Sequence, residues 1–170
     1  MKDHQQHLEL RWSEDQQTIY ADLRAPTREA SNKCVGDLVT YLGQALDNGN
    51  TFTLRINTSE SSACGSQGIK TIVAFMRKYR PKCAEQMRGS ALVIQSKVVR
   101  WVINTLFYIQ APASPVTVVS TLENADAYIA RALAGKIADH EQVRVDSCMI
   151  TQQLAGDAQD QADFQKMLAT

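Results

Sequence analysis

Several common features are absent from this chain of 170 residues, and each absence excludes a class of protein. No apolar run comes near the roughly 20 residues that a membrane-spanning helix needs, so we expect no stable insertion into a membrane. The start of the chain carries His4, Glu9 and Glu14 where a secretion signal needs an apolar core, so we expect a cytoplasmic protein. The formal net charge is zero, which argues against a general binder of polyanions.

Metal-binding and dithiol motifs are missing as well. The cysteines are widely spaced and form no Cys-x-x-Cys pair, which indicates ordinary reduced thiols at Cys34, Cys64, Cys83 and Cys148. His4 and His7 could share one face of a helix, but two imidazoles without a third ligand make a poor metal site. The sequence therefore predicts neither a metal nor a cofactor.

What is present suits one folded domain, since 44% of the residues are hydrophobic. Alternating or short apolar runs predict strands at 8–12, 19–23, 52–56, 91–95 and 116–119. Apolar residues at helical spacing predict helices at 28–47, 69–79, 98–109 and 122–133. The order β β α β α β α β α predicts an α/β fold, a mixed β-sheet with crossover helices and one antiparallel hairpin at the start.

Local signals mark where the predicted helices begin and end. Asn48-Gly49-Asn50 ends the first helix, Pro81 ends the second and Gly135 follows the last. The run Ser120-Thr121-Leu122-Glu123 offers a capping box at the start of the last helix. We therefore assign residues 1–135 to the domain. Residues 136–170 form a C-terminal extension, in which the pattern predicts an edge strand near 140–146 and a weak terminal helix.

The loop Gly65-Ser66-Gln67-Gly68-Ile69 lies between a predicted strand and a predicted helix. A hydroxyl at a helix start lies beside unpaired backbone N–H groups and the positive end of the helix dipole. Ser66 is then either the N-cap, which stabilises a helix by about 1 kcal/mol, or a regulatory serine. A phosphate there would be tolerated, and Lys70 could pair with it one turn later. Gly68 suits close packing at the helix start.

These residues carry a resemblance to a known family. The order of elements over residues 8–133, this loop, and the Ser90-Ala91-Leu92-Val93-Ile94-Gln95-Ser96 strand before a helix with Trp101 resemble STAS domains. That family includes anti-sigma-factor antagonists, and the related SpoIIAA-like group is similar too. The resemblance implies a non-enzymatic module that binds other proteins.

The resemblance also implies a site. The family loop typically reads Asp-Ser-Ser-Gly-Leu, and its first serine, which a partner kinase phosphorylates, matches Ser66. Gly65 replaces the acidic residue and Gln67 the second serine, while Gly68 and Ile69 keep the last pair in kind. The implied partner is a kinase or regulatory protein. The implied partner-binding residues are Gly65, Ser66, Gln67, Gly68, Ile69 and Lys70.

The surroundings of this loop are unusual in polarity and charge. Ser61-Ser62-Ala63-Cys64 replaces the apolar lead-in of the family, which predicts a raised and more mobile loop. Residues 65–115 contain eight basic residues and Glu85 as the single acid, whereas the chain beyond Lys136 is richer in acids. This polarity suits an acidic partner, nucleic acid, anionic lipid or an intramolecular contact. We expect no nucleic acid partner, because the aromatic residues follow core spacing and no binding motif is present.

Three further hypotheses come from other patterns. Cys64-Gly65-Ser66-Gln67-Gly68 is close to a hydrolase nucleophile elbow, and Asp126 or Asp139 followed by His140 would complete a triad order. Nine residues separate Ile56 from Ser66, whereas an elbow needs a direct strand-to-helix turn, so we expect no enzyme. The helix at 98–109 is apolar on more than one face and could be fully buried, line the pocket of a SpoIIAA-like carrier of an apolar or lipid ligand, or form a homodimer contact.

Overall fold

The computed structural model describes residues 7–137, which form a five-stranded sheet with five helices. The strands are β1 (Leu8–Ser13), β2 (Thr18–Leu23), β3 (Phe52–Asn57), β4 (Met87–Val93) and β5 (Val116–Val119). The helices are α1 (Arg28–Asp47), α2 (Ser66–Lys78), α3 (Arg80–Gln86), α4 (Lys97–Ile109) and α5 (Leu122–Leu133). No helix among these residues is long and apolar enough to cross a membrane.

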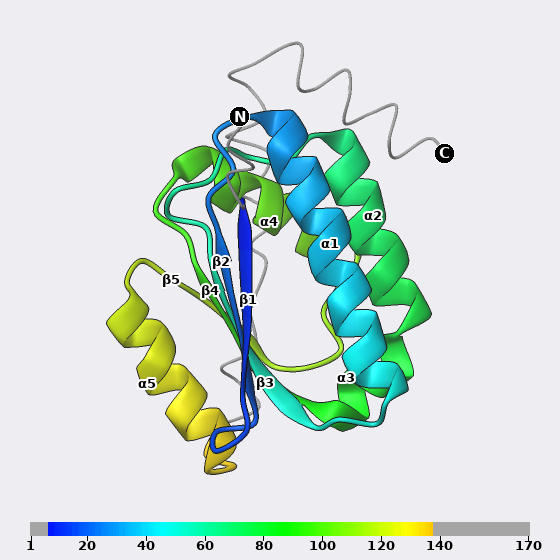
Figure 1. Ribbon diagram of the computed structural model, residues 1–170, viewed down its shortest axis with the longest axis vertical. Helices are drawn as coiled ribbons and strands as arrows, with labels where there is room; N and C mark the ends of the chain where they lie inside the picture. The colour runs from blue at the N-terminus through cyan, green and yellow to red at the C-terminus, as the bar shows by residue number, and fades with distance from the viewer. Residues whose placement is uncertain (1–6, 138–170) are drawn as a thin grey trace, which may run out of the picture.

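The strands lie in the order β1-β2-β3-β4-β5. β1 and β2 are antiparallel and every later pair is parallel, with Ile19 opposite Leu54 and Leu54 opposite Ser90. Parallel neighbours need crossover connections, which the helices supply. Figure 1 shows α1 and α2 side by side on one face of the sheet and α5 on the other. The predicted α/β fold, a mixed sheet with one antiparallel hairpin, is confirmed.

Most helix boundaries agree with the local signals. α1 begins after Thr27, whose hydroxyl accepts from the Ala30 amide at 3.2 Å. The predicted capping box places the N-cap at Ser120, which is one residue too early. Thr121 is the N-cap of α5, and its hydroxyl accepts from the Asn124 amide. Pro81 does end α2, but it also lies in the first turn of α3, a helix that the sequence pattern did not predict. Proline suits that position because the first turn of a helix needs no N–H donor there.

Apolar side chains of the sheet form two separate clusters on the face that carries α1 to α4. Leu54 and residues of β1 and β2 pack against α1, whereas Leu92 and Ile94 pack against α2 and α4. On the opposite face Ala91 and Val93 pack under α5. The core is therefore divided by the sheet, and on the α1 side it is divided again.

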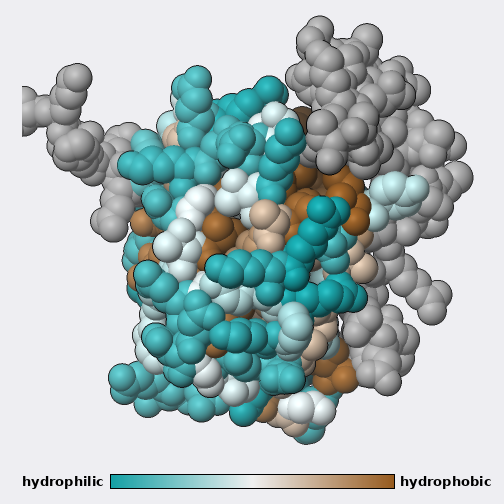
Figure 2. Space-filling model, turned by 90° about the vertical axis from the view of Figure 1, so that its right-hand side faces the viewer, coloured by the Kyte–Doolittle hydropathy of each residue, from teal (hydrophilic) through white to brown (hydrophobic). Residues whose placement is uncertain are grey.

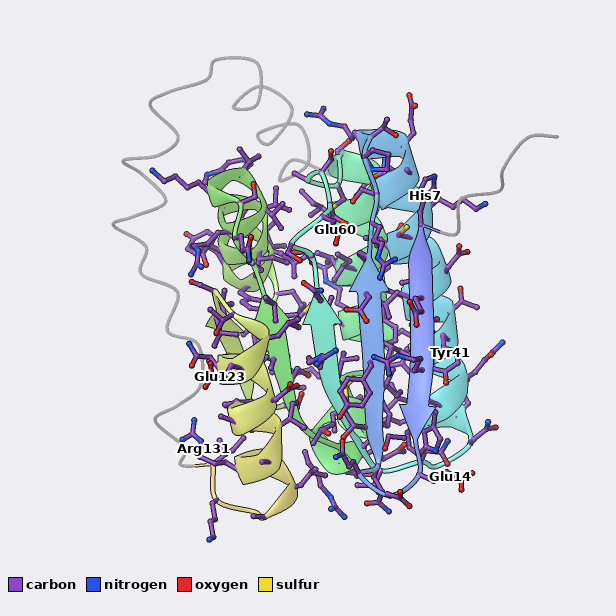
Figure 3. All side chains as sticks on the ribbon, turned by 60° about the vertical axis from the view of Figure 1, so that its left-hand side comes forward. His7, Glu14, Tyr41, Glu60, Glu123 and Arg131 are labelled. Atoms are coloured by element: carbon purple, nitrogen blue, oxygen red, sulfur yellow. The ribbon has the colours of Figure 1, made fainter. Side chains whose placement is uncertain are left out.

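Among residues 7–137, α5 packs on β3, β4 and β5, and no helix of this part of the chain covers the outer face of β1 and β2 (Figure 3). Arg55 lies at the border and is only 9% exposed. Its Nη1 donates to Asp126 Oδ1 of α5 at 2.8 Å, its Nη2 lies 3.9 Å from Asp22 Oδ2, and its guanidinium lies 4.5 Å from the centre of the Tyr20 ring. This ionic contact joins α5 to β2 and β3.

The C-terminal extension, for which the pattern predicts an edge strand near 140–146 and a terminal helix, lies outside the described residues apart from Lys136 and Ile137. His4, Asp139, His140 and Cys148 lie outside them as well. The division into residues 1–135 and 136–170 stays a prediction.

Candidate functional site

The surface around Ser66 is formed where two helices begin. α1 and α2 both start at the end of the domain where β2 and β3 finish (Figure 1). Ser66 is the first residue of α2, and its side chain is exposed together with those of Gln67 and Lys70. Gly68 and Ile69 are buried. The accessible part of the predicted site is therefore Gly65, Ser66, Gln67 and Lys70, which we call the α2-start surface.

The start of α2 is capped by α1 and not by a residue of its own. Gly65 is the N-cap and has no side chain to offer. Asn32, on α1, instead accepts two hydrogen bonds at its Oδ1, from the Gly65 amide at 2.9 Å and the Gly68 amide at 3.2 Å. The interpretation of Ser66 as an N-cap is wrong. Its hydroxyl makes no hydrogen bond within residues 7–137.

Close contact between the two helices explains the glycines of the loop. A Cβ on Gly68 would lie 2.7 Å from both Asn32 Oδ1 and Cys64 Cβ, distances that real Cβ atoms do not show. A Cβ on Gly65 would lie 3.0 Å from Cδ of Arg28. The expected role of Gly68 in close packing is confirmed. The same contacts bring Arg28 to the α2-start surface.

The loop before α2 is tied to the chain between β2 and α1. Ser62 donates from its amide to the Ala25 carbonyl at 2.7 Å and from its hydroxyl to the Pro26 carbonyl at 2.8 Å. The Ser61 hydroxyl accepts from the Ala25 amide at 3.2 Å. Ser61 and Ser62 thus attach the loop that precedes Ser66 to the chain between β2 and α1. The higher position and mobility of this loop relative to the family stay predictions.

Charge at the α2-start surface comes from two cations, Arg28 and Lys70. Burial raises the pKa of the nearby Cys64 thiol, and the charge of Arg28 opposes that rise. Cys34, Cys64 and Cys83 are free thiols, and residues 7–137 hold no group of three His, Cys, Asp or Glu side chains suited to a metal ion.

Several other cations of the basic segment have structural contacts instead. Arg77 donates to Gln110 at 3.3 Å and Arg80 to the Ala111 carbonyl at 3.0 Å, so α2 and α3 hold the chain that follows α4. Lys82 lies 2.7 Å from Asp47. Arg77, Arg80 and Lys82, three cations of the basic segment, therefore make contacts within the fold.

The residues of the hydrolase hypothesis are not brought together within the described chain. α5 packs on the opposite face of the sheet from α2, and Asp126 is engaged by Arg55 there. Ser66 follows a hydrogen-bonded loop from Thr58 to Gly65 and not a tight strand-to-helix turn. His140 lies outside the described residues.

A second feature lies between the two apolar clusters. A cavity of about 150 Å³, partly open to the surface, is lined by the sheet and by α1, α2, α3 and α4. Its walls include Leu42, Leu54, Ile72, Phe75, Leu106 and Phe107. Protein interiors are normally packed with few voids larger than a water molecule, so a cavity of this size is a candidate ligand site.

Helix α4 contributes one wall of the cavity. Ile103, Leu106 and Phe107 line it, whereas Val98 is 59% and Tyr108 is 58% exposed. The expectation that this helix is fully buried is therefore wrong, because its apolar residues point both inward and outward.

The layer of α1 and α2, seen from outside in Figure 2, is mostly hydrophilic with small hydrophobic areas between.

Sequence reasoning found Ser66 and the apolar helix but missed Asn32 and Arg28. Both lie on α1, and Asn32 is 33 residues from the loop that it caps. A local pattern cannot reveal such a partner, because nothing near Asn32 in the sequence distinguishes it from a solvated helix residue.

The close contact at Gly68 leads to a stability prediction. We expect Gly68→Ala to lower the free energy of unfolding by about 1 to 3 kcal/mol, because the new methyl group would push Asn32 away from the amides that it caps. Gly36→Ala is the matched control: Gly36 lies within α1 with no atom near its ideal Cβ position, so alanine there should stabilise by up to about 1 kcal/mol. Urea unfolding of both variants measures this. Equal changes in the two variants would contradict the contact.

In comparisons with known proteins, no family model matches this chain and no curated protein matches it.

Proposed function

We propose that this domain is a STAS-like, non-enzymatic protein-interaction module, and that phosphorylation of Ser66 switches its contact with a regulatory partner. The observation that carries the proposal is the position of Ser66. Its hydroxyl is exposed at the first residue of α2 and has no capping role, because Asn32 performs that role. A structural serine would be expected to use its hydroxyl in the fold.

The surroundings of Ser66 suit a phosphate group. The amides of Ser66 and Gln67 have no acceptor within residues 7–137, so they are available to phosphate oxygens at the positive end of α2. Arg28 and Lys70 add positive charge beside them. Phosphorylation would add about 1.5 to 2 negative charges without disturbing the cap that Asn32 provides.

The same charges suggest how the switch acts on the partner. With Ser66 unmodified, Arg28 and Lys70 favour an acidic partner surface, such as that of a kinase or another regulatory protein. A phosphate would neutralise this surface and repel the acidic groups of the partner. The change is local, so the domain keeps its fold while its affinity falls.

This switch predicts different effects for two substitutions of one residue. We expect Ser66→Ala to bind the partner like the wild type and Ser66→Glu to bind about tenfold more weakly, because a carboxylate at this position repels an acidic surface. Binding is measured by quantitative capture of the partner from the source cells, with thermal unfolding of each variant alongside. We expect both variants to unfold at the same temperature as the wild type.

Thr40→Glu serves as the control for the added charge, because Thr40 is exposed on α1 away from the start of α2. It should bind like the wild type. Equal capture by the wild type, Ser66→Ala and Ser66→Glu would refute the switch. A loss with Thr40→Glu equal to that with Ser66→Glu would show an effect of net charge alone.

We infer a second candidate function, carriage of an apolar or lipid ligand, which the cavity of about 150 Å³ favours. A volume of roughly this size has room for a molecule such as benzene. The helix α4, whose apolar character suggested a carrier, supplies one wall.

The carrier function predicts a bound molecule. Native mass spectrometry of the domain isolated from its source cells should give a mass above that of the chain, and unfolding should release the difference. Ala113→Leu, which adds bulk to the cavity lining, should lose the ligand, whereas Ala84→Leu on the exposed side of α3 should keep it. A wild-type mass equal to that of the empty chain would count against carriage.

Two finer expectations belong to the same proposal. A homodimer would use the outer face of α4, where Val98 and Tyr108 are exposed. The proposed regulatory partner is a cytoplasmic protein, and we therefore propose that the domain is cytoplasmic as well.

A further inference from the structure

Two hydroxyl groups lie in the otherwise apolar lining of the cavity. Ser90 on β4 is 4% exposed and Ser114, just before β5, is 6% exposed. The Ser90 amide donates to the carbonyl of Pro115 at 2.9 Å, so the two serines lie on neighbouring segments of the lining. Neither hydroxyl bonds a group of residues 7–137, and neither oxygen is among the fully enclosed unpaired polar atoms of these residues, so both reach open space.

A hydroxyl that bonds no protein group and reaches the open space of a cavity is free to bond a molecule there. Apolar walls that provide affinity, together with a few polar groups that fix orientation, are the arrangement of a ligand site.

The rest of the lining restricts the charge of the ligand. All twenty lining residues are uncharged. Burial raises the pKa of the Cys83 thiol in this lining to about 11, so that group is neutral at pH 7 as well. A carboxylate or ammonium group would enter without a counter-ion, which is strongly unfavourable. The ligand must be neutral where it lies in the cavity.

We propose that the cavity binds a neutral molecule of about one ring in size whose single hydroxyl or carbonyl oxygen is held by Ser90 and Ser114. This proposal rests on the carrier function and specifies its ligand class. The volume admits a benzene-sized group. Each serine can donate to the ligand oxygen or accept from its hydroxyl, so alcohols, phenols, ketones and aldehydes all suit these two hydroxyls.

Phenol and toluene test the role of the two serine hydroxyls, because they differ only in a hydroxyl in place of a methyl group. Their dissociation constants would be measured by calorimetric titration with the wild type and with the Ser90→Ala/Ser114→Ala double variant. We expect the preference for phenol over toluene to fall by about tenfold in the double variant, as loss of one to two hydrogen bonds predicts. The ratio cancels the greater hydrophobicity of toluene.

Two controls locate the effect. Ser62→Ala removes a hydroxyl that bonds Pro26 outside the cavity, so it should leave the ratio unchanged. Methyl resonances of Leu54 and Leu106 should shift on titration, because both residues line the cavity. Shifts confined to residues outside the lining would overturn the proposal.

The outcomes separate the two proposals. Binding of both probes with the same ratio in the wild type and the double variant would refute the role of the two serine hydroxyls and leave the carrier function standing. No binding of either probe to the wild type would count against both. If the double variant fails to fold, the phenol-to-toluene preference is measured with the single variants Ser90→Ala and Ser114→Ala, which are smaller changes.

Discussion

The two hydrogen bonds to Asn32 Oδ1 are the contact on which the candidate site depends. They satisfy amides at the start of α2 from a neighbouring helix, and they set the distance between α1 and α2. Because Asn32 must reach both amides, Gly68 has to lack a side chain, whereas a Cβ on Gly65 would meet the side chain of Arg28. Ser66 between them then has nothing to cap, and its hydroxyl faces outward. The functional hypothesis is thus a consequence of a packing constraint.

The sheet separates two kinds of interaction that have different consequences. On the outer face, Arg55 joins α5 to β2 through carboxylates and an aromatic ring, which fixes α5 by directional contacts. On the other face, α1 packs on one end of the sheet and α4 on the other, so two apolar clusters meet without filling the space between. The cavity lies where the two clusters meet, with Leu54 of one cluster and Leu92 of the other in its lining.

Local sequence signals predicted much of the fold. The span of α1 agrees at both ends, since a threonine cap and an Asn-Gly stop are properties of adjacent residues. α3 was missed because Pro81 was interpreted only as an end, whereas proline also suits the first turn of a helix. The strand with Arg55 was predicted, but its partner Asp126 comes from a helix that is distant in sequence.

The candidate site was predicted only in part, for the same physical reason. The position of Ser66 at a helix start follows from its neighbours in sequence. Its freedom from capping depends on Asn32, and the hydroxyl-bearing part of the cavity lining depends on pairing of Ser90 with the chain before β5. Such contacts arise from tertiary packing, which one sequence without its fold does not reveal.

Asn32, and not Ser66, caps α2. Amide hydrogen exchange at Gly65 and Gly68, followed by NMR in the wild type, Asn32→Ala and Ser66→Ala, tests this assignment. The Ala30 amide, which Thr27 caps on α1, reports any general loss of stability. The account predicts faster exchange at Gly65 and Gly68 in Asn32→Ala alone, with Ala30 unchanged. Faster exchange at these two amides in Ser66→Ala, with none in Asn32→Ala, would contradict it.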